Sequence, residues 1–204
     1  MAAREIPVLV FAFVGAPAAG KTEAASVAKE MGIPVITMGE VIRAELRKRG
    51  LPLSDENAGR VANEFRACEG MDAIAKRCIP LIKGVERKRA GITVIVIDGI
   101  RGIAEVETFK KEFCSDFVLV RVEAPLYLRY ERIKSRGRGD DLLSIEEFKN
   151  REERELGWGM GEAMKKADKV VKNAVSLEAF KEQIKEILLR YPLSNCSISC
   201  GLKS

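Results

Sequence analysis

The residues best suited to chemistry form one uninterrupted glycine-rich segment near the amino end. Residues 15–22 match the pattern G-x-x-x-x-G-K-[ST] without a gap, between an apolar run and a helical pattern. Glycines let backbone amides turn toward a phosphate, and the start of a helix adds a favourable dipole. In such a loop Lys21 offers a positive charge to the β and γ phosphates, and Thr22 offers a hydroxyl to Mg²⁺. The predicted ATP-binding loop consists of Gly15, Ala16, Pro17, Ala18, Ala19, Gly20, Lys21 and Thr22.

A second candidate is Asp98, the last residue of the apolar run ITVIVID (92–98). An acid at the end of such a strand can hold Mg²⁺ directly or through water, so Thr22 and Asp98 are the predicted metal residues. The alternative is that Asp98 is an ordinary turn or capping residue. The sequence contains no histidine, which excludes a Ser-His-Asp triad, a Cys-His pair and a His-ligated metal site. The chemistry must therefore come from Lys, Arg, acids, backbone amides and a metal ion.

The composition indicates a globular protein with a basic balance. The chain has 204 residues, of which 47% are hydrophobic and 32% charged, and its formal net charge is +5. This length suits one α/β domain. The positive balance fits acidic partners such as nucleotides, phosphorylated metabolites or RNA, but charges alternating along solvated helix faces explain most of it. The five cysteines contain no C-x-x-C pair, so neither a disulfide framework nor a zinc site is indicated.

Apolar runs and helical patterns alternate along the chain. We expect strands at 7–15, 34–37, 92–98, 116–123 and 169–173, and helices at 21–31, 39–49, 55–68, 71–90, 103–113, 126–136, 144–157 and 177–190. Such alternation predicts an α/β fold with a five-stranded parallel sheet and helices on both faces. The run at 7–15 is too short to span a bilayer and lacks the basic flank of a signal peptide, so we expect no membrane partner and a cytoplasmic protein.

The predicted domain organisation is simple. Residues 1–190 form one domain, and 191–204 form a flexible tail. Within the domain, the helical block 38–90 interrupts the alternation of strands and helices. It is expected beside the carboxyl ends of the strands, where ligands bind in parallel sheets. The polar, Gly-punctuated segment 136–141 is predicted to be a loop or lid.

Four further segments resemble adenylate kinase and its nucleoside-monophosphate-kinase relatives. They are IPVITMGEVIRAELRKRG (33–50), DGIRG (98–102), YERIKSRGRGDD (130–141) and ADKVVKNAVSLEAF (167–180). The last is most similar to dephospho-CoA kinases, and together they resemble an archaeal group of adenylate-kinase-related, dephospho-CoA-kinase-like P-loop kinases. The resemblance implies a P-loop NTPase fold with a helical acceptor-binding insertion and a short lid. It also implies ATP as donor, Mg²⁺ as cofactor and a small phosphorylated acceptor.

The resemblance also implies roles for individual residues. The acceptor would be bound by Gly39, Glu40, Arg43, Arg101 and Glu105, and the donor base by Arg132 and Asn173. The lid would contain Arg136, Arg138, Asp140, Asp141, Arg151 and Arg154. The groups acting on the transferred phosphoryl would be Lys21, Arg101, Arg136 and Arg138, because a guanidinium binds phosphate through two bonds and stays protonated. The alternatives are surface ion pairs for Arg132, Arg151 and Arg154, and a helix cap near residue 144 for the two aspartates.

Two departures concern the acceptor. Met38 stands where adenylate kinase has a Thr that contacts the AMP base, and Glu105 stands where it has an adenine-reading Gln. A carboxylate accepts hydrogen bonds but cannot donate one as an amide does. We therefore expect that AMP is not preferred and that Glu105 reads a donor-rich base edge. The alternative is that Glu105 only favours the start of helix 103–113 through the helix dipole.

These observations predict ATP-dependent phosphoryl transfer to a nucleotide or nucleotide-like phosphorylated acceptor. No general base is evident, which favours a phosphate over a hydroxyl acceptor; for a hydroxyl, the candidate bases would be Glu40 and Asp98. Dephospho-CoA is an alternative acceptor. An alternative of another class is an ATP-binding switch or an RNA-associated NTPase, although nucleic acid is not the favoured partner. The oligomeric state is left open.

Overall fold

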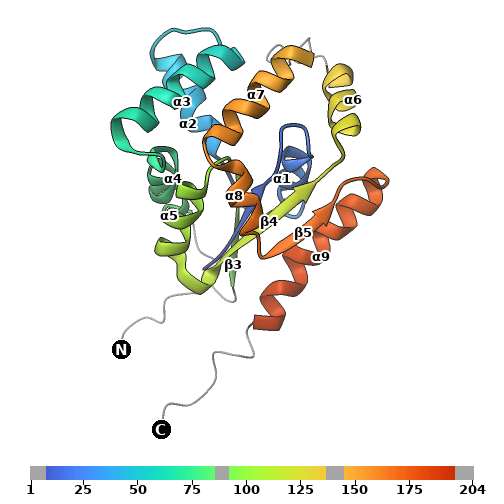
Figure 1. Cartoon of the computed structure of the whole chain (residues 1–204). Helices are drawn as coiled ribbons and strands as arrows, with labels where there is room; N and C mark the ends of the chain where they lie inside the picture. Colours follow the sequence, from blue (N-terminus) through green and yellow to red (C-terminus); the bar gives the residue numbers. More distant parts are fainter. Residues whose placement is uncertain (1–7, 86–91, 137–144, 196–204) are drawn as a thin grey trace, which may run out of the picture.

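The strands form one parallel sheet in a computed structural model that describes residues 8–85, 92–136 and 145–195. In chain order they are β1 (Val8–Val14), β2 (Val35–Thr37), β3 (Thr93–Ile100), β4 (Phe117–Glu123) and β5 (Lys169–Lys172). Their order across the sheet is β2-β3-β1-β4-β5, and every neighbouring pair is parallel (Figure 1). The predicted five-stranded parallel sheet is confirmed.

Helices cover both faces of this sheet. They are α1 (Lys21–Glu30), α2 (Met38–Lys48), α3 (Asp55–Glu69), α4 (Ala73–Lys83), α5 (Ile103–Phe113), α6 (Leu126–Arg136), α7 (Ile145–Gly157), α8 (Met160–Lys165) and α9 (Leu177–Asn195), with a short 3-10 turn at Cys114–Asp116. Side chains that alternate along β1 belong to two separate hydrophobic clusters, one on each face of the sheet. Val10 and Ala12 pack toward α2, α4, α5 and α8, whereas Phe11 and Phe13 pack toward α1 and α9. A strand buried on both faces is therefore apolar throughout.

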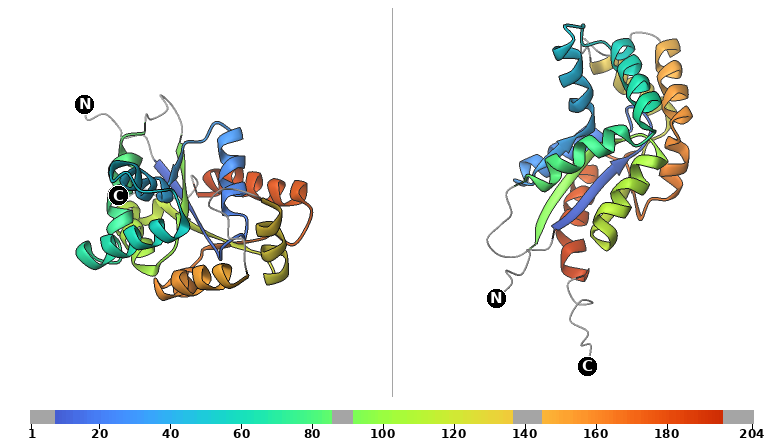
Figure 2. Two further views of the ribbon diagram at one scale, coloured as in Figure 1. Left: turned by 90° about the horizontal axis from the view of Figure 1, so that it is seen from above. Right: turned by 90° about the vertical axis from the view of Figure 1, so that its left-hand side faces the viewer.

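The block of helices α2 to α4 follows β2 and precedes β3. Helix α2 buries Met38, Ile42 and Leu46, which are four residues apart and so share one face. The side chain of Ser54 caps α3 by accepting a hydrogen bond from the backbone N–H of Asn57 at 3.2 Å. Helices α2, α3 and α7 extend past the carboxyl ends of the strands, as Figures 1 and 2 show. This edge of the sheet is where the candidate site lies.

The largest differences from the sequence prediction are two helix ends and one additional helix, and β3 also continues two residues further, to Ile100. Helix α4 ends at Lys83 instead of continuing to residue 90, and residues 86–91 lie outside the described part of the chain. Helix α8 was not predicted, because six residues starting after Gly159 are too few to show a helical period. Helix α9 continues past the predicted end at Arg190 to Asn195, into the segment expected to be a flexible tail. Residues 196–204 are not described.

Candidate functional site

The phosphate-binding segment connects β1 to α1, as predicted. Gly20 has a φ of 114°, a conformation that favours glycine. A Cβ at this position would lie 2.2 Å from Nδ2 of Asn173. The same Nδ2 donates a hydrogen bond to the carbonyl oxygen of Ala19 at 2.8 Å. The glycine therefore leaves room for Asn173, which follows β5, to hold the phosphate loop through this hydrogen bond.

The ammonium group of Lys21 lies inside this loop. It donates hydrogen bonds to the carbonyl oxygens of Gly15 at 2.5 Å and Ala16 at 3.1 Å. Desolvation lowers the pKa of Lys21 to about 8, although the carboxylates of Glu155 and Asp98 act in the opposite direction. The group is thus largely protonated at pH 7, and a bound polyphosphate would favour the protonated form further.

Asp98 is buried at the carboxyl end of β3, opposite Phe13 of β1 and Thr37 of β2. Desolvation raises the pKa of its carboxyl, against the attraction of Lys21 and Arg101. Asp98 and Thr22 line the same cavity and offer oxygen ligands of the kind that Mg²⁺ prefers. Within the described residues, no cluster of three or more acids or cysteines could hold a metal alone. The site therefore fits an ion that takes its other ligands from phosphates and water.

One cavity of about 580 Å³ brings residues of the phosphate loop together with several predicted acceptor residues, whereas the predicted donor-base residues Arg132 and Asn173 do not line it. The site residues from the sequence prediction that line it are Pro17, Ala18, Gly20, Lys21, Thr22, Gly39, Glu40, Arg43, Asp98, Arg101 and Arg151. A second cavity of about 590 Å³ lies beside β4, β5 and α8 and contains neither Lys21 nor Asp98. The chemistry assigns the first cavity as the candidate site.

The acceptor side of this cavity is formed by the start of α2. Nε of Arg43 contacts Oε1 of Glu40 at 2.6 Å, and Nη2 of Arg47 contacts Oε2 at 3.3 Å. A Cβ on Gly39 would lie 3.4 Å from Nη1 of Arg43, so the glycine lets the guanidinium lie close to the helix. Burial opposes ionisation of Glu40, but the two arginines outweigh it and lower its pKa. Glu40 is thus the ionised partner of two guanidinium groups.

The two predicted donor-base residues, Arg132 and Asn173, also meet. Nη2 of Arg132 donates to the backbone and side-chain oxygens of Asn173, both at 3.0 Å. A neighbouring residue that the sequence did not single out, Arg129, donates to the carbonyl oxygen of Pro17 at 3.3 Å and contacts Glu152 of α7 at 2.9 Å. Helix α6 therefore supports the phosphate loop through Arg129 and through Arg132, which holds Asn173 against Ala19. Contact of Arg132 with the donor base stays a prediction.

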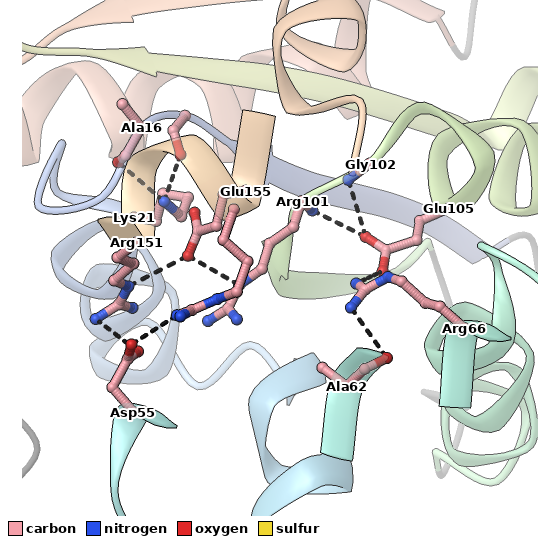
Figure 3. A network of polar contacts seen from close by, with 12 residues as sticks. Ala16, Lys21, Asp55, Ala62, Arg66, Arg101, Gly102, Glu105, Arg151 and Glu155 are labelled. Atoms are coloured by element: carbon pink, nitrogen blue, oxygen red, sulfur yellow. Dashed lines mark hydrogen bonds and ion pairs between the residues drawn. The ribbon is translucent and has the colours of Figure 1, made fainter. Parts of the chain in front are cut away.

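A network of acids and arginines closes the other side of the cavity, and two of its members were not predicted (Figure 3). Oε1 of Glu155 lies 3.2 Å from Nε of Arg151 and 3.5 Å from Nε of Arg101. Asp55 at the start of α3 contacts Arg151 at 3.6 Å and Arg154 at 2.6 Å. The only sequence signal was the i,i+4 spacing of Arg151 and Glu155, which is common on exposed helices.

Glu155 is 1% exposed, and it lines the cavity together with Lys21. Burial opposes its ionisation, but Arg101, Lys21 and Arg151 outweigh this effect and lower its pKa. Oε2 of this carboxylate has no hydrogen-bond partner among the described residues. Glu155 is thus a buried anion surrounded by the cations expected to bind phosphate.

The hypothesis that Glu105 reads the acceptor base is wrong. Glu105 is buried and does not line the cavity. Its Oε1 contacts Nη2 of Arg66 at 2.8 Å, and its Oε2 accepts hydrogen bonds from the backbone N–H groups of Arg101 at 2.8 Å and Gly102 at 3.2 Å. Both oxygens are therefore used inside the protein, where Glu105 starts α5 and anchors the loop that carries Arg101.

The structure describes only some of the residues predicted to form the lid. Arg136 ends α6, but its side chain and residues 137–144, which include Arg138, Asp140 and Asp141, lie outside the described part of the chain. Arg151 lines the cavity, whereas Arg154 does not. Instead, Arg154 pairs with Asp55, and its guanidinium lies 5.7 Å from the ring of Trp158. The structure thus brings one of these two arginines to the site, and the other lies outside the cavity.

No helix within residues 8–85, 92–136 and 145–195 has the length and apolar character needed to cross a bilayer.

Comparison with known sequences gives consistent matches. Residues 14–149 match a family described as an AAA domain. The chain is 51% identical over 182 residues to a UPF0200 protein of Methanosarcina barkeri, covering 89% of this chain and 95% of that protein. It is 37% identical over 188 residues to a UPF0200 protein of Pyrococcus horikoshii, covering 92% and 99%. A UPF0200/UPF0201 protein of Archaeoglobus fulgidus is 56% identical over 181 residues, covering 89% of this chain but 55% of that protein, so the chain spans about half of its length.

Comparison with solved structures identifies the fold. A structure of TT1252 from Thermus thermophilus superposes with a TM-score of 0.58 at 20% identity, covering 91% of this chain and 98% of that one. A gluconokinase from Sinorhizobium meliloti gives 0.56 at 16% identity, covering 97% and 100%. A shikimate kinase from Acinetobacter baumannii in complex with shikimate gives 0.52 at 20% identity, covering 94% and 95%. The predicted fold class, an α/β P-loop NTPase of the kinase type, is confirmed.

Proposed function

The chain belongs to the UPF0200 family, and from this premise we propose that it transfers the γ-phosphoryl group of Mg-ATP to a nucleotide or nucleotide-like phosphorylated acceptor. One observation carries the proposal. A single cavity of about 580 Å³ joins the phosphate loop with the guanidinium groups of Arg43, Arg101 and Arg151. A cavity that brings cations to face a phosphate loop suits two anionic substrates held in line.

The proposed roles follow from charge and position. Lys21 and Arg101 would offset the negative charge that develops on the γ-phosphoryl group as it moves. Thr22 and Asp98 would hold Mg²⁺, which supplies a further positive charge to the phosphate oxygens. Arg43 would bind the phosphate of the acceptor. An oxygen of that phosphate forms the new P–O bond, while the bond between the γ phosphorus and the β–γ bridging oxygen breaks and ADP leaves.

A phosphate acceptor is supported over a hydroxyl acceptor by the state of the carboxylates. A hydroxyl often needs a base poised near neutral pH to accept its proton. Arginines hold the pKa of both Glu40 and Glu155 low, which makes them poor bases. Among the described acids that line the cavity, burial raises the pKa of Asp98 alone, but Asp98 is also the proposed Mg²⁺ ligand. An acceptor phosphate needs no base, because it is already largely ionised at pH 7.

The adenylate-kinase relationship and the cytoplasmic location remain part of this proposal. ATP is the proposed donor, and the cytoplasm is where ATP is abundant. Dephospho-CoA stays an alternative acceptor, on the resemblance of segment 167–180. Dephospho-CoA would receive the phosphoryl group on a ribose hydroxyl, whereas a nucleoside monophosphate would receive it on its phosphate, so the product of one experiment separates the two acceptor classes.

The test is to incubate the purified protein with Mg-ATP and, separately, AMP, GMP, CMP, UMP and dephospho-CoA, and to identify products by mass spectrometry. We expect at least one acceptor to gain a phosphoryl group while ADP forms. The Lys21→Ala variant should lose this activity and keep its fold, because the ammonium group contacts the loop rather than the apolar core. If no acceptor is modified, or if folded Lys21→Ala is fully active, the proposal fails.

A further inference from the structure

We propose that Glu155 is a positioning residue of the phosphate site, which directs Arg101 toward the transferred phosphoryl group at the expense of affinity for ATP. The inference rests on the proposed function. It concerns a residue that no motif indicated and that lies far along the chain from the phosphate loop. Glu155 and Arg151 are the two described residues of α7 that line the cavity, and Figure 3 shows the contacts of Glu155 with Arg151 and Arg101.

The contact geometry supports this role. The closest contacts of Glu155 to both guanidinium groups use Nε, at 3.2 Å for Arg151 and 3.5 Å for Arg101. A guanidinium has two binding edges, and for Arg101 a partner at Nε leaves the edge formed by the two terminal nitrogens for bidentate contact with a phosphate. Arg151 is held differently, because its Nη1 also contacts Oδ1 of Asp55 at 3.6 Å. One carboxylate oxygen therefore contacts arginines from two elements, and it orients Arg101 without replacing the phosphate.

The helix that carries Glu155 is itself held firmly. Asp55 of α3 bridges Arg151 and Arg154 on the same helix. Just beyond α7, the carbonyl oxygen of Trp158 would lie 2.4 Å from a Cβ at Gly102, so only glycine allows this approach to the loop of Arg101. Trp158 also donates a hydrogen bond from Nε1 to Asn63 at 2.8 Å. The carboxylate thus has a fixed position relative to Arg101.

The charge balance explains the effect on ATP. Glu155 places a buried negative charge among Lys21, Arg101 and Arg151, close to where a triphosphate would carry its own charge. A carboxylate at this place repels the negative phosphates of ATP. It also offsets the mutual repulsion of the three positive groups around it. The benefit of well-placed arginines is a lower energy of the transition state, because that is where negative charge develops on the transferred phosphoryl group. Weaker binding and faster transfer are therefore expected from the same group.

A second buried glutamate provides an internal comparison. Glu105 is equally buried, but it pairs with Arg66 and backbone N–H groups and does not line the cavity. Its oxygens are all partnered, whereas Oε2 of Glu155 has no hydrogen-bond partner among the described residues. Burial alone therefore does not distinguish Glu155 from Glu105. The difference is that Glu155 lines the cavity.

The test compares Glu155→Gln and Glu155→Asp with the matched control Glu153→Gln, which makes the same chemical change at an exposed position of α7. Calorimetry measures the affinity for Mg-ATP without any acceptor, and product formation with the acceptor identified above measures transfer. For Glu155→Gln we expect binding tighter by about three- to tenfold and transfer slower by about 10- to 100-fold. Glu155→Asp keeps the charge but shortens the arm, so its affinity should stay near wild type while transfer falls. Glu153→Gln should change neither quantity.

The outcomes separate positioning from structural support. If Glu155→Gln loses affinity and transfer together, or changes neither, while circular dichroism shows a folded protein, the proposal is overturned. If Glu155→Gln does not fold, Glu155→Asp decides, and transfer at the wild-type rate contradicts positioning. If the wild type modifies no acceptor, the proposed function fails. Tighter Mg-ATP binding by Glu155→Gln would then still support the electrostatic part, and unchanged or weaker binding would overturn it.

Discussion

Replacing Glu105 by glutamine should destabilise the protein rather than change its acceptor. The carboxylate accepts from Arg66 through Oε1 and from the N–H groups of Arg101 and Gly102 through Oε2. A glutamine side chain has one oxygen and one NH₂ group. In either orientation the NH₂ group would therefore face a donor, and the Arg66 guanidinium would stay buried without a charged partner.

The magnitude follows from the burial of the pair. The side chains of Arg66 and Glu105 are 4% and 1% exposed, so solvent cannot replace the lost contact. Removing one partner of such a buried pair costs about 3–5 kcal/mol. Replacing both, with Arg66→Met and Glu105→Leu, should recover a large part of this loss, since no charge then remains buried.

Urea unfolding measures this directly, and the single tryptophan of the sequence reports it. Trp158 lies under the guanidinium of Arg66 at 4.0 Å, so its emission responds to this region. Glu107→Gln on the same helix is the control, because its contact to Lys166 at 3.9 Å is exposed and worth about 0.5 kcal/mol or less. Unchanged stability of Glu105→Gln together with an altered acceptor preference would refute the structural role of Glu105.

Three further predictions follow from the phosphate loop and its neighbours. Gly20→Ala should lower the free energy of unfolding by about 2–4 kcal/mol. The new Cβ would lie 2.2 Å from Nδ2 of Asn173, and Gly20 has a φ of 114°, so the change combines backbone strain with a lost buried hydrogen bond. Chemical denaturation measures this loss, and a midpoint equal to that of the wild type would contradict it. Since the pKa of Lys21 is about 8 in the free protein and phosphate raises it, Mg-ATP binding at pH 8.5 should take up protons, and affinity should fall as the pH rises above 8. Calorimetry in buffers of different ionisation enthalpy measures this uptake, which should be absent in Lys21→Ala; equal uptake in both proteins would exclude Lys21 as its source. Asp55→Asn should loosen the first turn of α3 from α7 at a cost of about 1 kcal/mol, because its two arginine contacts are partly exposed. Faster hydrogen exchange at the start of α3, with no change in β1, is the expected result, and unchanged exchange there would show that other contacts hold the two helices together.

The phosphate loop and the sheet were predictable because their signals are local. The loop motif is contiguous, and Lys21 and Thr22 occupy adjacent positions in it. Strands β1 and β3 are largely apolar runs, and their burial on both faces follows directly from composition. Asp98 lies in the cavity near the carboxyl end of β3, although the strand continues to Ile100 and does not end at Asp98 as predicted. Its place there was predictable because parallel strands end at the same edge.

Glu155 and Glu105 show where sequence reasoning stopped. Glu155 is one of several acids in a charged helix, and only the docking of α7 over the cavity distinguishes it from its exposed neighbour Glu153. Glu105 was assigned from the resemblance to a family position, but its side chain turns inward, where it pairs with Arg66 of α3. Such contacts between distant segments have no signature in residue spacing.

The central claim is tested most directly by the fate of the γ-phosphoryl group. The measurement follows ADP and free phosphate together during turnover of Mg-ATP, with and without each acceptor. A kinase with the proposed site should form ADP in excess of free phosphate, and the excess that derives from ATP should equal the phosphorylated acceptor. With AMP the product is itself ADP, so the total excess should be twice the amount transferred. If ADP and free phosphate appear in equal amounts with every acceptor, water is the only acceptor. The cavity that joins Lys21 to Arg43 and Arg101 would then belong to an NTPase.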